Sequence, residues 1–213
     1  MPIKVVFFDC DGTLTKTTSS WEYLHRRLNL WTKNADTYQA LFREGKIDYN
    51  EFCRRDALLW RGLPVSMVYQ LISEIGYQEN AAEVVEILRK SGIFTVIISS
   101  GLSLLVNRVK EDLSVDMAYS NELVSQAGLL TGDIKINVEY NRKGPLVREI
   151  LGILGLQREE ASAVGDGDGD GGMFDEVALP IGFIAGGGCF GHPGCGSLAR
   201  ELHDVVRFVR EYP

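Results

Sequence analysis

Two short stretches of the chain concentrate carboxylate side chains. FFDCDGTLT holds Asp9 and Asp11, separated by one residue, and VGDGDGDGG at 164–172 holds three more aspartates among glycines. Carboxylates gathered at one point repel one another unless a cation joins them, and hard oxygen ligands favour Mg²⁺. If the fold brings the two stretches together, we expect a magnesium site between them.

The second stretch alone also matches the start of a calcium-binding loop, with Gly171 at its sixth position. That loop needs a glutamate at its twelfth position, where this chain has Val177, and it follows a helix. Because a strand is predicted before Asp166, the calcium interpretation is rejected.

Serine and lysine residues complete a set that suits a phosphate group. Ser99, Ser100 and Gly101 follow an apolar run, and Lys143 stands just before a predicted helix. Magnesium, a lysine and a serine together would bind a phosphate dianion. One carboxylate could then attack phosphorus to form an aspartyl-phosphate, and a second carboxylate two residues along could transfer protons.

The predicted elements place these residues at one edge of a sheet. Buried strands are predicted at 3–8, 93–98, 161–164 and 179–184, and helices at 80–91 and 145–155. This alternation predicts an α/β fold with a Rossmann-like, doubly wound parallel sheet. In such sheets ligands bind beyond the carboxyl ends of the strands, which is where Asp9, Ser99 and Asp166 stand.

Residues 16–78 interrupt the alternation. Four consecutive helices are predicted there, because apolar residues recur at three- and four-residue spacing. We expect an inserted helical cap at 16–78, a core formed by 1–15 and 79–213, and a β-hairpin at 121–136 beside the sheet. A cap that closes over the site would have hinges at 13–15 and 76–77.

Composition narrows the class of protein. The 213 residues carry a formal net charge of −7, so the basic stripe typical of nonspecific nucleic-acid binding is not expected. Charges or glycines interrupt every apolar run before it reaches the length of a membrane span, and no signal peptide is recognisable. We therefore expect a cytoplasmic monomer or homodimer that contacts neither membrane nor nucleic acid.

The four cysteines form no disulfide framework, which suits a reducing compartment. Cys189, His192 and Cys195 offer only three metal ligands at a spacing unlike that of zinc sites. A glycine-rich loop at 186–196 with incidental thiols is the favoured interpretation.

Four motifs in order, FFDCDGTLT, IISSG, RKG and VGDGDGDGGMF, resemble the signature motifs of the haloacid-dehalogenase-like (HAD) phosphatases. The likeness is greatest to the phosphoserine phosphatase branch, in which a helical cap of the C1 type follows the first motif. It extends to EGKIDYNEF, LTGDI and NRKGPLVREIL. The resemblance implies a Mg²⁺-dependent phosphatase that hydrolyses a small phosphorylated metabolite through an aspartyl-phosphate.

Carried over by position, the resemblance makes Asp9 the nucleophile and Asp11 the general acid and base. It implies a Mg²⁺ site formed by the Asp9 side chain, the Asp11 backbone carbonyl and Asp166. Asp170 would hold the metal's waters or support the lysine, whereas Asp168 would face solvent.

The resemblance also implies how the phosphoryl group is bound. Ser99 would donate a hydrogen bond to it, helped by the backbone of Ser100 and Gly101. Lys143 would neutralise its charge.

The chain departs from the family pattern at three positions. Gly169 stands where the fourth motif has an asparagine, which removes an amide that orients the lysine or the substrate. Thr18 and Asp56 stand where phosphoserine phosphatases have a glutamate for the substrate's ammonium group and an arginine for its carboxylate. An aspartate would repel a carboxylate, so a substrate other than phosphoserine is expected unless a register shift brings Arg54 or Arg55 into the site.

Other interpretations remain open at this point. Trp21, Tyr23, Trp31 and Trp60 could line a pocket for an apolar leaving group, although at helical spacing a core role is favoured. Transfer of the phosphoryl group to an alcohol would use the same aspartyl-phosphate. A catalytically silent relative would be expected to lack Asp9, Asp11 or Lys143, all of which are present.

Overall fold

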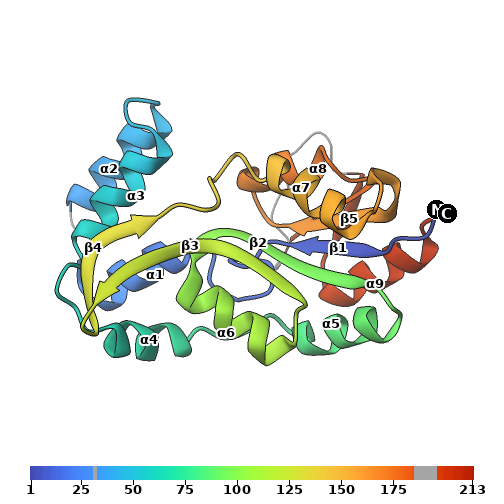
Figure 1. Ribbon diagram of the computed structural model, residues 1–213, viewed down its shortest axis with the longest axis horizontal. Helices are drawn as coiled ribbons and strands as arrows, with labels where there is room; N and C mark the ends of the chain where they lie inside the picture. The colour runs from blue at the N-terminus through green and yellow to red at the C-terminus, as the bar shows by residue number, and fades with distance from the viewer. Residues whose placement is uncertain (31–32, 185–195) are drawn as a thin grey trace.

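The computed structural model of the chain describes residues 1–30, 33–184 and 196–213 (Figure 1). Trp31, Cys189, His192 and Cys195, for which sequence suggested roles, lie outside the described residues.

A mostly parallel sheet runs through the molecule. In the described residues its strands are β1 (Val5–Phe8), β2 (Phe94–Leu102), β3 (Met117–Gln126), β4 (Leu129–Lys135), β5 (Ala161–Gly165), β6 (Leu179–Phe183) and β7 (Ser197–Ala199). Their order across the sheet is β4-β3-β2-β1-β5-β6-β7. The central strand β1 pairs in parallel with both β2 and β5, so the predicted α/β fold with a parallel sheet is confirmed.

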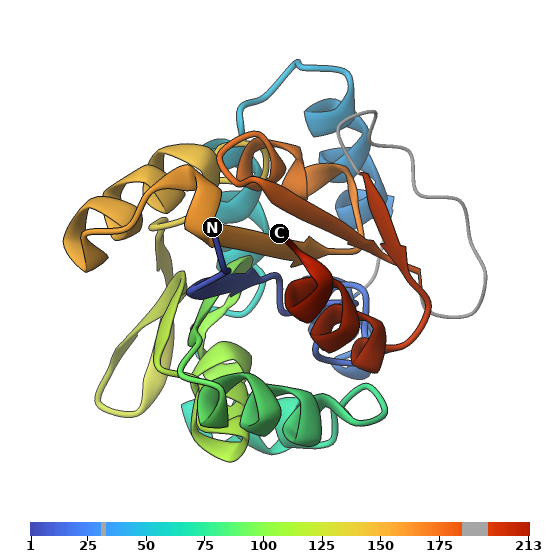
Figure 2. The same ribbon diagram turned by 90° about the vertical axis from the view of Figure 1, so that its right-hand side faces the viewer.

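Helices cover both faces of the sheet (Figure 2). In the described residues the helices are α1 (Ser20–Arg27), α2 (Lys33–Arg43), α3 (Tyr49–Leu58), α4 (Val65–Ser73), α5 (Ala81–Lys90), α6 (Ser103–Leu113), α7 (Gly144–Leu154), α8 (Gly171–Phe174) and α9 (Leu202–Glu211). Val6 and Phe8 of β1 pack in one core with α5, α6 and α9. Val5 and Phe7 pack in the other with α7 and α8. Because both faces are covered, all four residues of β1 are apolar and buried.

The predicted hairpin exists and is continuous with the main sheet. The first part of β3 pairs in parallel with β2, from Met117 to Asn121. From Glu122 onwards β3 pairs in antiparallel fashion with β4. The strand therefore begins four residues before the predicted hairpin, and it ties the hairpin to the carboxyl end of β2.

The four helices predicted between 16 and 78 are confirmed. At one end of the molecule α3 packs next to β4, and α2 packs on α3 (Figure 1). By contrast, side chains of α1 and α4, such as Leu24 and Val68, belong to the same buried cluster as β1 and α6. The chain enters and leaves this region side by side, because the backbone N–H of Lys16 donates to the Gly76 carbonyl at 2.9 Å.

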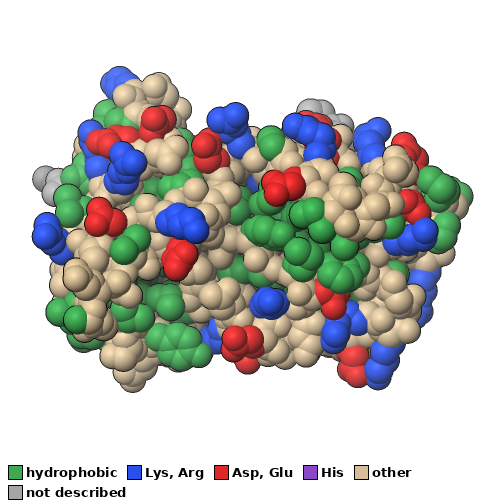
Figure 3. Space-filling model, in the orientation of Figure 1, with side chains coloured by type: hydrophobic (Ala, Val, Ile, Leu, Met, Phe, Trp, Pro, Cys, Tyr) green, Lys and Arg blue, Asp and Glu red, His purple; other side chains and the backbone are tan. Residues whose placement is uncertain are grey.

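The surface carries mixed charge. On the face drawn in Figure 3, acidic and basic side chains are interspersed, and the described residues form no continuous basic area there. Within the described ranges, no helix combines the length and apolar character that crossing a membrane requires.

Candidate active site

A cavity of about 790 Å³ opens at the carboxyl ends of β1, β2 and β5. Asp9 directly follows β1, Asp166 directly follows β5, and Lys143 is the N-cap residue of α7. The predicted catalytic, metal and substrate residues that line this cavity are Asp9, Asp11, Thr18, Asp56, Ser99, Ser100, Gly101, Lys143, Asp166 and Asp170. The structure thus brings all of the predicted site residues to one place.

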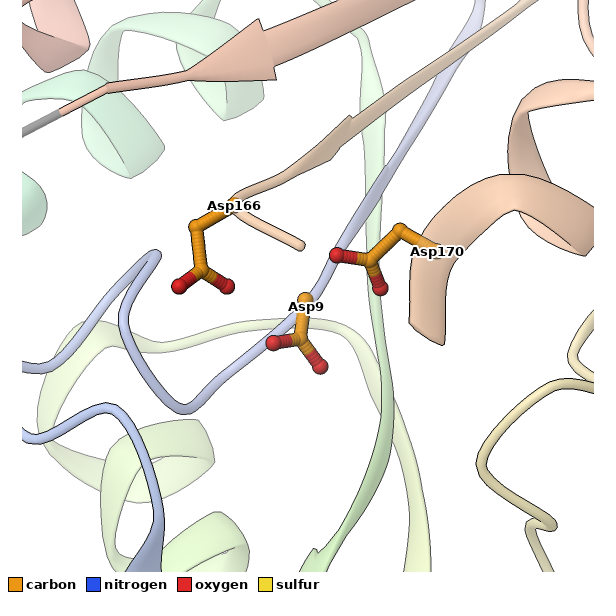
Figure 4. A group of neighbouring side chains, drawn as sticks. All are labelled: Asp9, Asp166 and Asp170. Atoms are coloured by element: carbon orange, nitrogen blue, oxygen red, sulfur yellow. The ribbon is translucent and has the colours of Figure 1, made fainter. Parts of the chain in front are cut away.

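Three carboxylates converge on a single point at the base of the cavity (Figure 4). One oxygen each from Asp9, Asp166 and Asp170 lies within 4.8 Å of the others. The ammonium group of Lys143 donates to Asp9 Oδ1 and Asp170 Oδ1, both at 2.6 Å. Lys143 is 2% exposed, so this is a buried ion cluster with more negative than positive charge.

Burial changes the acidity of this cluster. Burial raises the pKa of Asp9 well above its usual value, although the Lys143 charge opposes the change. Burial, with the nearby charge of Asp170, also raises the pKa of Asp166 to about 7. Burial alone would lower the pKa of Lys143, but the charges of Asp170 and Asp9 outweigh it and raise that pKa. Three crowded carboxylates with one lysine are the donor set that a hard divalent cation would stabilise.

Asp11 lies outside this group of three and has a separate environment. Its Oδ2 accepts hydrogen bonds from the backbone N–H of Ser20 at 3.0 Å and from the Ser20 hydroxyl at 2.7 Å. Its Oδ1 is buried and accepts no hydrogen bond from the described residues. Burial raises the pKa of Asp11, with the Ser20 hydrogen bonds acting against it. The side chain is therefore held at one oxygen, while the other is available to a ligand or a proton.

A glycine lets the two acidic stretches approach each other. Gly12 has a φ of +82°, and a Cβ there would lie 2.1 Å from Asp166 Oδ2. Any side chain at this position would displace the Asp166 carboxylate, so the turn after Asp11 depends on glycine.

Residues 99–101, near the carboxyl end of β2, are held by a hydrogen bond among themselves and by hydrogen bonds from α1 and α3. Ser99 is buried, and its Oγ accepts from the Gly101 N–H at 3.0 Å. The Ser100 carbonyl accepts from the Trp21 indole at 3.2 Å and the Tyr49 hydroxyl at 3.0 Å. These contacts join α1 and α3 to residues 99–101.

Asn121 of β3 is a member of this network that the sequence analysis missed. Its Nδ2 donates to the Ser100 carbonyl and the Val138 carbonyl, both at 2.9 Å. Its Oδ1 accepts from the N–H groups of Asn137 and Val138, also at 2.9 Å. A fully buried amide therefore links the segment of Ser99 to the chain that leads to Lys143.

Tyr140 is a second residue that the sequence did not reveal. It lines the cavity, and its ring lies against Gly169, at the position where the resemblance leads to an asparagine. Asp168, the aspartate expected to face solvent, is exposed, and it lies on the wall of the same cavity. The change at Gly169 is thus accompanied by an aromatic side chain that fills the adjacent space.

Thr18 and Asp56, the residues that differ from the pattern of the phosphoserine phosphatases, both line the cavity. Thr18 is exposed at its rim, whereas Asp56 is 4% exposed. In the part of the chain that the structure describes, neither Arg54 nor Arg55 lines the cavity, and Arg55 pairs with Glu51 at 2.8 Å. The register shift that would put an arginine in the site does not occur.

The sequence left open whether Trp21, Tyr23 and Trp60 belong to the core or line a pocket, and the structure shows both cases. Trp60 is fully buried in the core, and Tyr23 packs against it. Trp21 is half-buried and lines the cavity, with its ring centroid 5.3 Å from that of Trp60.

Comparisons with known proteins agree with the geometry. The family model of the haloacid dehalogenase-like hydrolases matches residues 6–175. The chain is 33% identical to phosphoserine phosphatase from Methanocaldococcus jannaschii over 208 residues, or 97% of this chain and 98% of that protein. It is 32% identical to phosphoserine phosphatase from Archaeoglobus fulgidus over 85% of this chain and 53% of that longer protein.

A solved structure shares the arrangement in space. A phospho-aspartyl intermediate analogue of phosphoserine phosphatase has a TM-score of 0.81 and 27% identity, over 98% of this chain and 99% of that one. The family model covers most of the sequence, one relative is matched along nearly its whole length, and a solved structure has the same fold. The chain belongs to the haloacid dehalogenase-like hydrolases and, among them, to the phosphatases of the phosphoserine phosphatase-like branch.

Proposed function

We propose that the protein is a Mg²⁺-dependent phosphatase that hydrolyses a small phosphomonoester through an aspartyl-phosphate on Asp9. The observation that carries the proposal is the convergence of Asp9, Asp166 and Asp170 on one point beside Lys143. This arrangement combines a cation site, a buried positive charge and a carboxylate that can act as nucleophile.

The cation would be held by Asp9, Asp166 and Asp170, and Asp11 would add its backbone carbonyl as the resemblance implies. When bound, it would offset the negative charge of the cluster and attract the phosphoryl oxygens. Lys143 would neutralise further charge on those oxygens, and the Ser99 hydroxyl and the N–H groups after it would orient them.

The two carboxylates of the first motif would have different tasks. A carboxylate oxygen of Asp9 attacks phosphorus while the bond from phosphorus to the leaving oxygen breaks. Asp11, whose pKa is raised by burial, gives its proton to that oxygen. Asp11 then takes a proton from a water molecule, the water oxygen attacks phosphorus, and the Asp9 carboxylate is released with inorganic phosphate.

We also propose that the substrate differs from phosphoserine, the substrate named for the similar proteins. Asp56, a buried acid, lines the cavity and would repel a carboxylate there.

Residues 16–78 would form the cap and 1–15 with 79–213 the core. Because α1 and α4 share the buried core, closing motion would be concentrated in α2 and α3.

The proposal is tested by p-nitrophenyl phosphate hydrolysis with Mg²⁺ and with a chelator, for the wild type and for Asp9→Asn. Turnover should require Mg²⁺ and should be lost in Asp9→Asn, and acid quenching should trap one phosphate per wild-type chain. Asp168→Asn is the matched control, because this aspartate of the same loop is exposed and outside the cluster. No turnover with any divalent cation would overturn the proposal, and phosphorylation of added alcohols would identify a phosphotransferase.

A further inference from the structure

The cavity has a second end, formed by α1, α2 and α3, that the chemistry at phosphorus does not use. Tyr49, Phe52 and Asp56 all line it from α3. They are three and four residues apart, so they share one face of that helix. Trp21 of α1 and Phe42 of α2 line the cavity as well.

The aromatic side chains at this end are packed on one another. The Phe42 and Phe52 rings are stacked, with centroids 5.2 Å apart and an angle of 11° between their planes. The Phe42 and Tyr49 centroids are 5.8 Å apart. Tyr49 is fixed further by its hydrogen bond to the Ser100 carbonyl. These contacts hold the three rings together as one wall of the cavity.

Asp56 places a buried negative charge next to this wall. Its Oδ2 lies 3.6 Å from His25 Nε2, within ion-pair distance if the imidazole is protonated but longer than a hydrogen bond. Its Oδ1 is buried and has no hydrogen-bond partner in the described ranges. A buried carboxylate oxygen without a donor is costly, so a cation or donor on a ligand would be favoured there.

The other charged residues at this end do not supply that cation. Glu22 is itself acidic and pairs with Arg26 at 2.7 Å. Arg43 lines the cavity but is exposed, so water screens its charge. Among the described acidic and basic residues that line this second end, Asp56 is the buried one.

We infer that this end binds an ammonium group, so that the substrate is the phosphate monoester of an alcohol that bears a cationic nitrogen and no carboxylate. The inference rests on the proposed phosphatase function. Aromatic faces attract a cation through their quadrupole, and Asp56 supplies the opposite charge. Asp11 and Lys143 would act on the phosphate ester while the ammonium group lies between Asp56 and the rings.

Pairs of phosphate esters that have a similar shape but differ in charge test whether the positive charge of the substrate matters. Phosphocholine and 3,3-dimethylbutyl phosphate have nearly the same shape, but only the first has a positive charge. Phosphoethanolamine and 2-hydroxyethyl phosphate form a second, smaller pair. We expect kcat/KM to be at least roughly tenfold higher for the charged member of one pair, which corresponds to about 1.4 kcal/mol. Phosphoserine should be a poorer substrate than phosphoethanolamine, because it adds a carboxylate.

Variants test whether Asp56 is responsible for the preference for positively charged substrates. In Asp56→Asn the ratio of kcat/KM between charged and neutral members should fall towards one, while in Glu22→Gln, at the same end of the cavity, it should be kept. In Asp56→Arg the preference should turn towards phosphoserine. Circular dichroism checks that each variant is folded, and the wild-type ratios do not depend on any variant.

The outcomes distinguish this inference from the function on which it rests. If p-nitrophenyl phosphate and the neutral esters are hydrolysed but charge gives no advantage, the inference is overturned and the phosphatase function stands. If no ester is hydrolysed, the phosphatase function fails. Calorimetry of the same pairs on Asp9→Asn then decides the inference, because equal affinity for charged and neutral members overturns it and tighter binding of the charged member supports it.

Discussion

The ring of Tyr140 occupies the space that a side chain at Gly169 would need. A Cβ at position 169 would lie 2.7 Å from Tyr140 Cε2 and 3.0 Å from its Cδ2. The same ring meets Phe42 of α2 edge on, with centroids 6.3 Å apart. Tyr140 therefore connects the acidic loop of the core to the helix that stands over the cavity.

This relationship predicts that Gly169→Asn and Tyr140→Ala are coupled. Gly169→Asn alone should push the tyrosine ring aside, lowering the melting temperature and reducing kcat/KM about tenfold or more. In Gly169→Asn/Tyr140→Ala the asparagine has room, so the double variant should lose less than the two single variants combined. Thermal unfolding and p-nitrophenyl phosphate kinetics on all four chains should give a coupling of about 1 kcal/mol or more. Additive effects would show that the two positions are independent.

The Lys143 ammonium group is predicted to stabilise the protein as well as the phosphate complex. Lys143→Met would leave Asp9 and Asp170 buried without their shared partner, which should lower the free energy of unfolding by about 3–5 kcal/mol at neutral pH. Urea unfolding in the presence of a chelator measures this, and turnover should be lost with Mg²⁺ present. Lys90→Met is the control, since Lys90 is exposed and pairs only with Glu86 among the described contacts. Equal stability of the two variants would contradict the prediction.

Most of the fold was predictable because apolar spacing repeats along the chain. The strands around β1 are short apolar runs, and the helices between 16 and 78 have three- and four-residue spacing. Helices α6 and α9 were missed although they carry the same signal, for example at Leu202, Val205, Val206 and Val209. Strand β7 has only three residues and is partly exposed, so its pattern carries no comparable signal.

The end of the cavity that holds the three carboxylates was predictable for a different reason. Its residues stand at strand ends, and a parallel sheet brings such ends together whatever the loops between them do. Asn121 and Tyr140 could not be found in this way. Asn121 binds backbone atoms of distant segments, and Tyr140 packs against a residue that has no side chain, so neither leaves a pattern in the sequence.

The acidity of Asp166 predicts how metal and pH act together. In the metal-free chain its pKa is raised from 3.8 to about 7, so the native state keeps a proton that the unfolded state has released. Stability of the metal-free protein should therefore fall as pH rises between about 4 and 7. Mg²⁺ should raise the melting temperature more at pH 8 than at pH 5, where it must displace that proton.

Two neighbouring variants provide the check on this pH dependence. Asp166→Asn should flatten the fall in stability and reduce the effect of Mg²⁺. Asp168→Asn should behave like the wild type, because Asp168 is exposed and outside the carboxylate cluster. A Mg²⁺-induced shift that is equal at both pH values would contradict the prediction.

Asn121 is predicted to set the position of Ser99 relative to Lys143. Asn121→Ala removes the donors to the Ser100 and Val138 carbonyls and leaves buried backbone N–H groups unpaired, so the free energy of unfolding should fall by about 3 kcal/mol or more. In the folded fraction kcat should drop about tenfold or more, because the phosphate-binding segment is no longer fixed against Lys143. Asn137→Ala is the matched control, since this exposed side chain donates a single hydrogen bond, to the Ser120 carbonyl. A loss of stability with unchanged kcat would show that the Asn121 amide holds the fold together without positioning the catalytic groups.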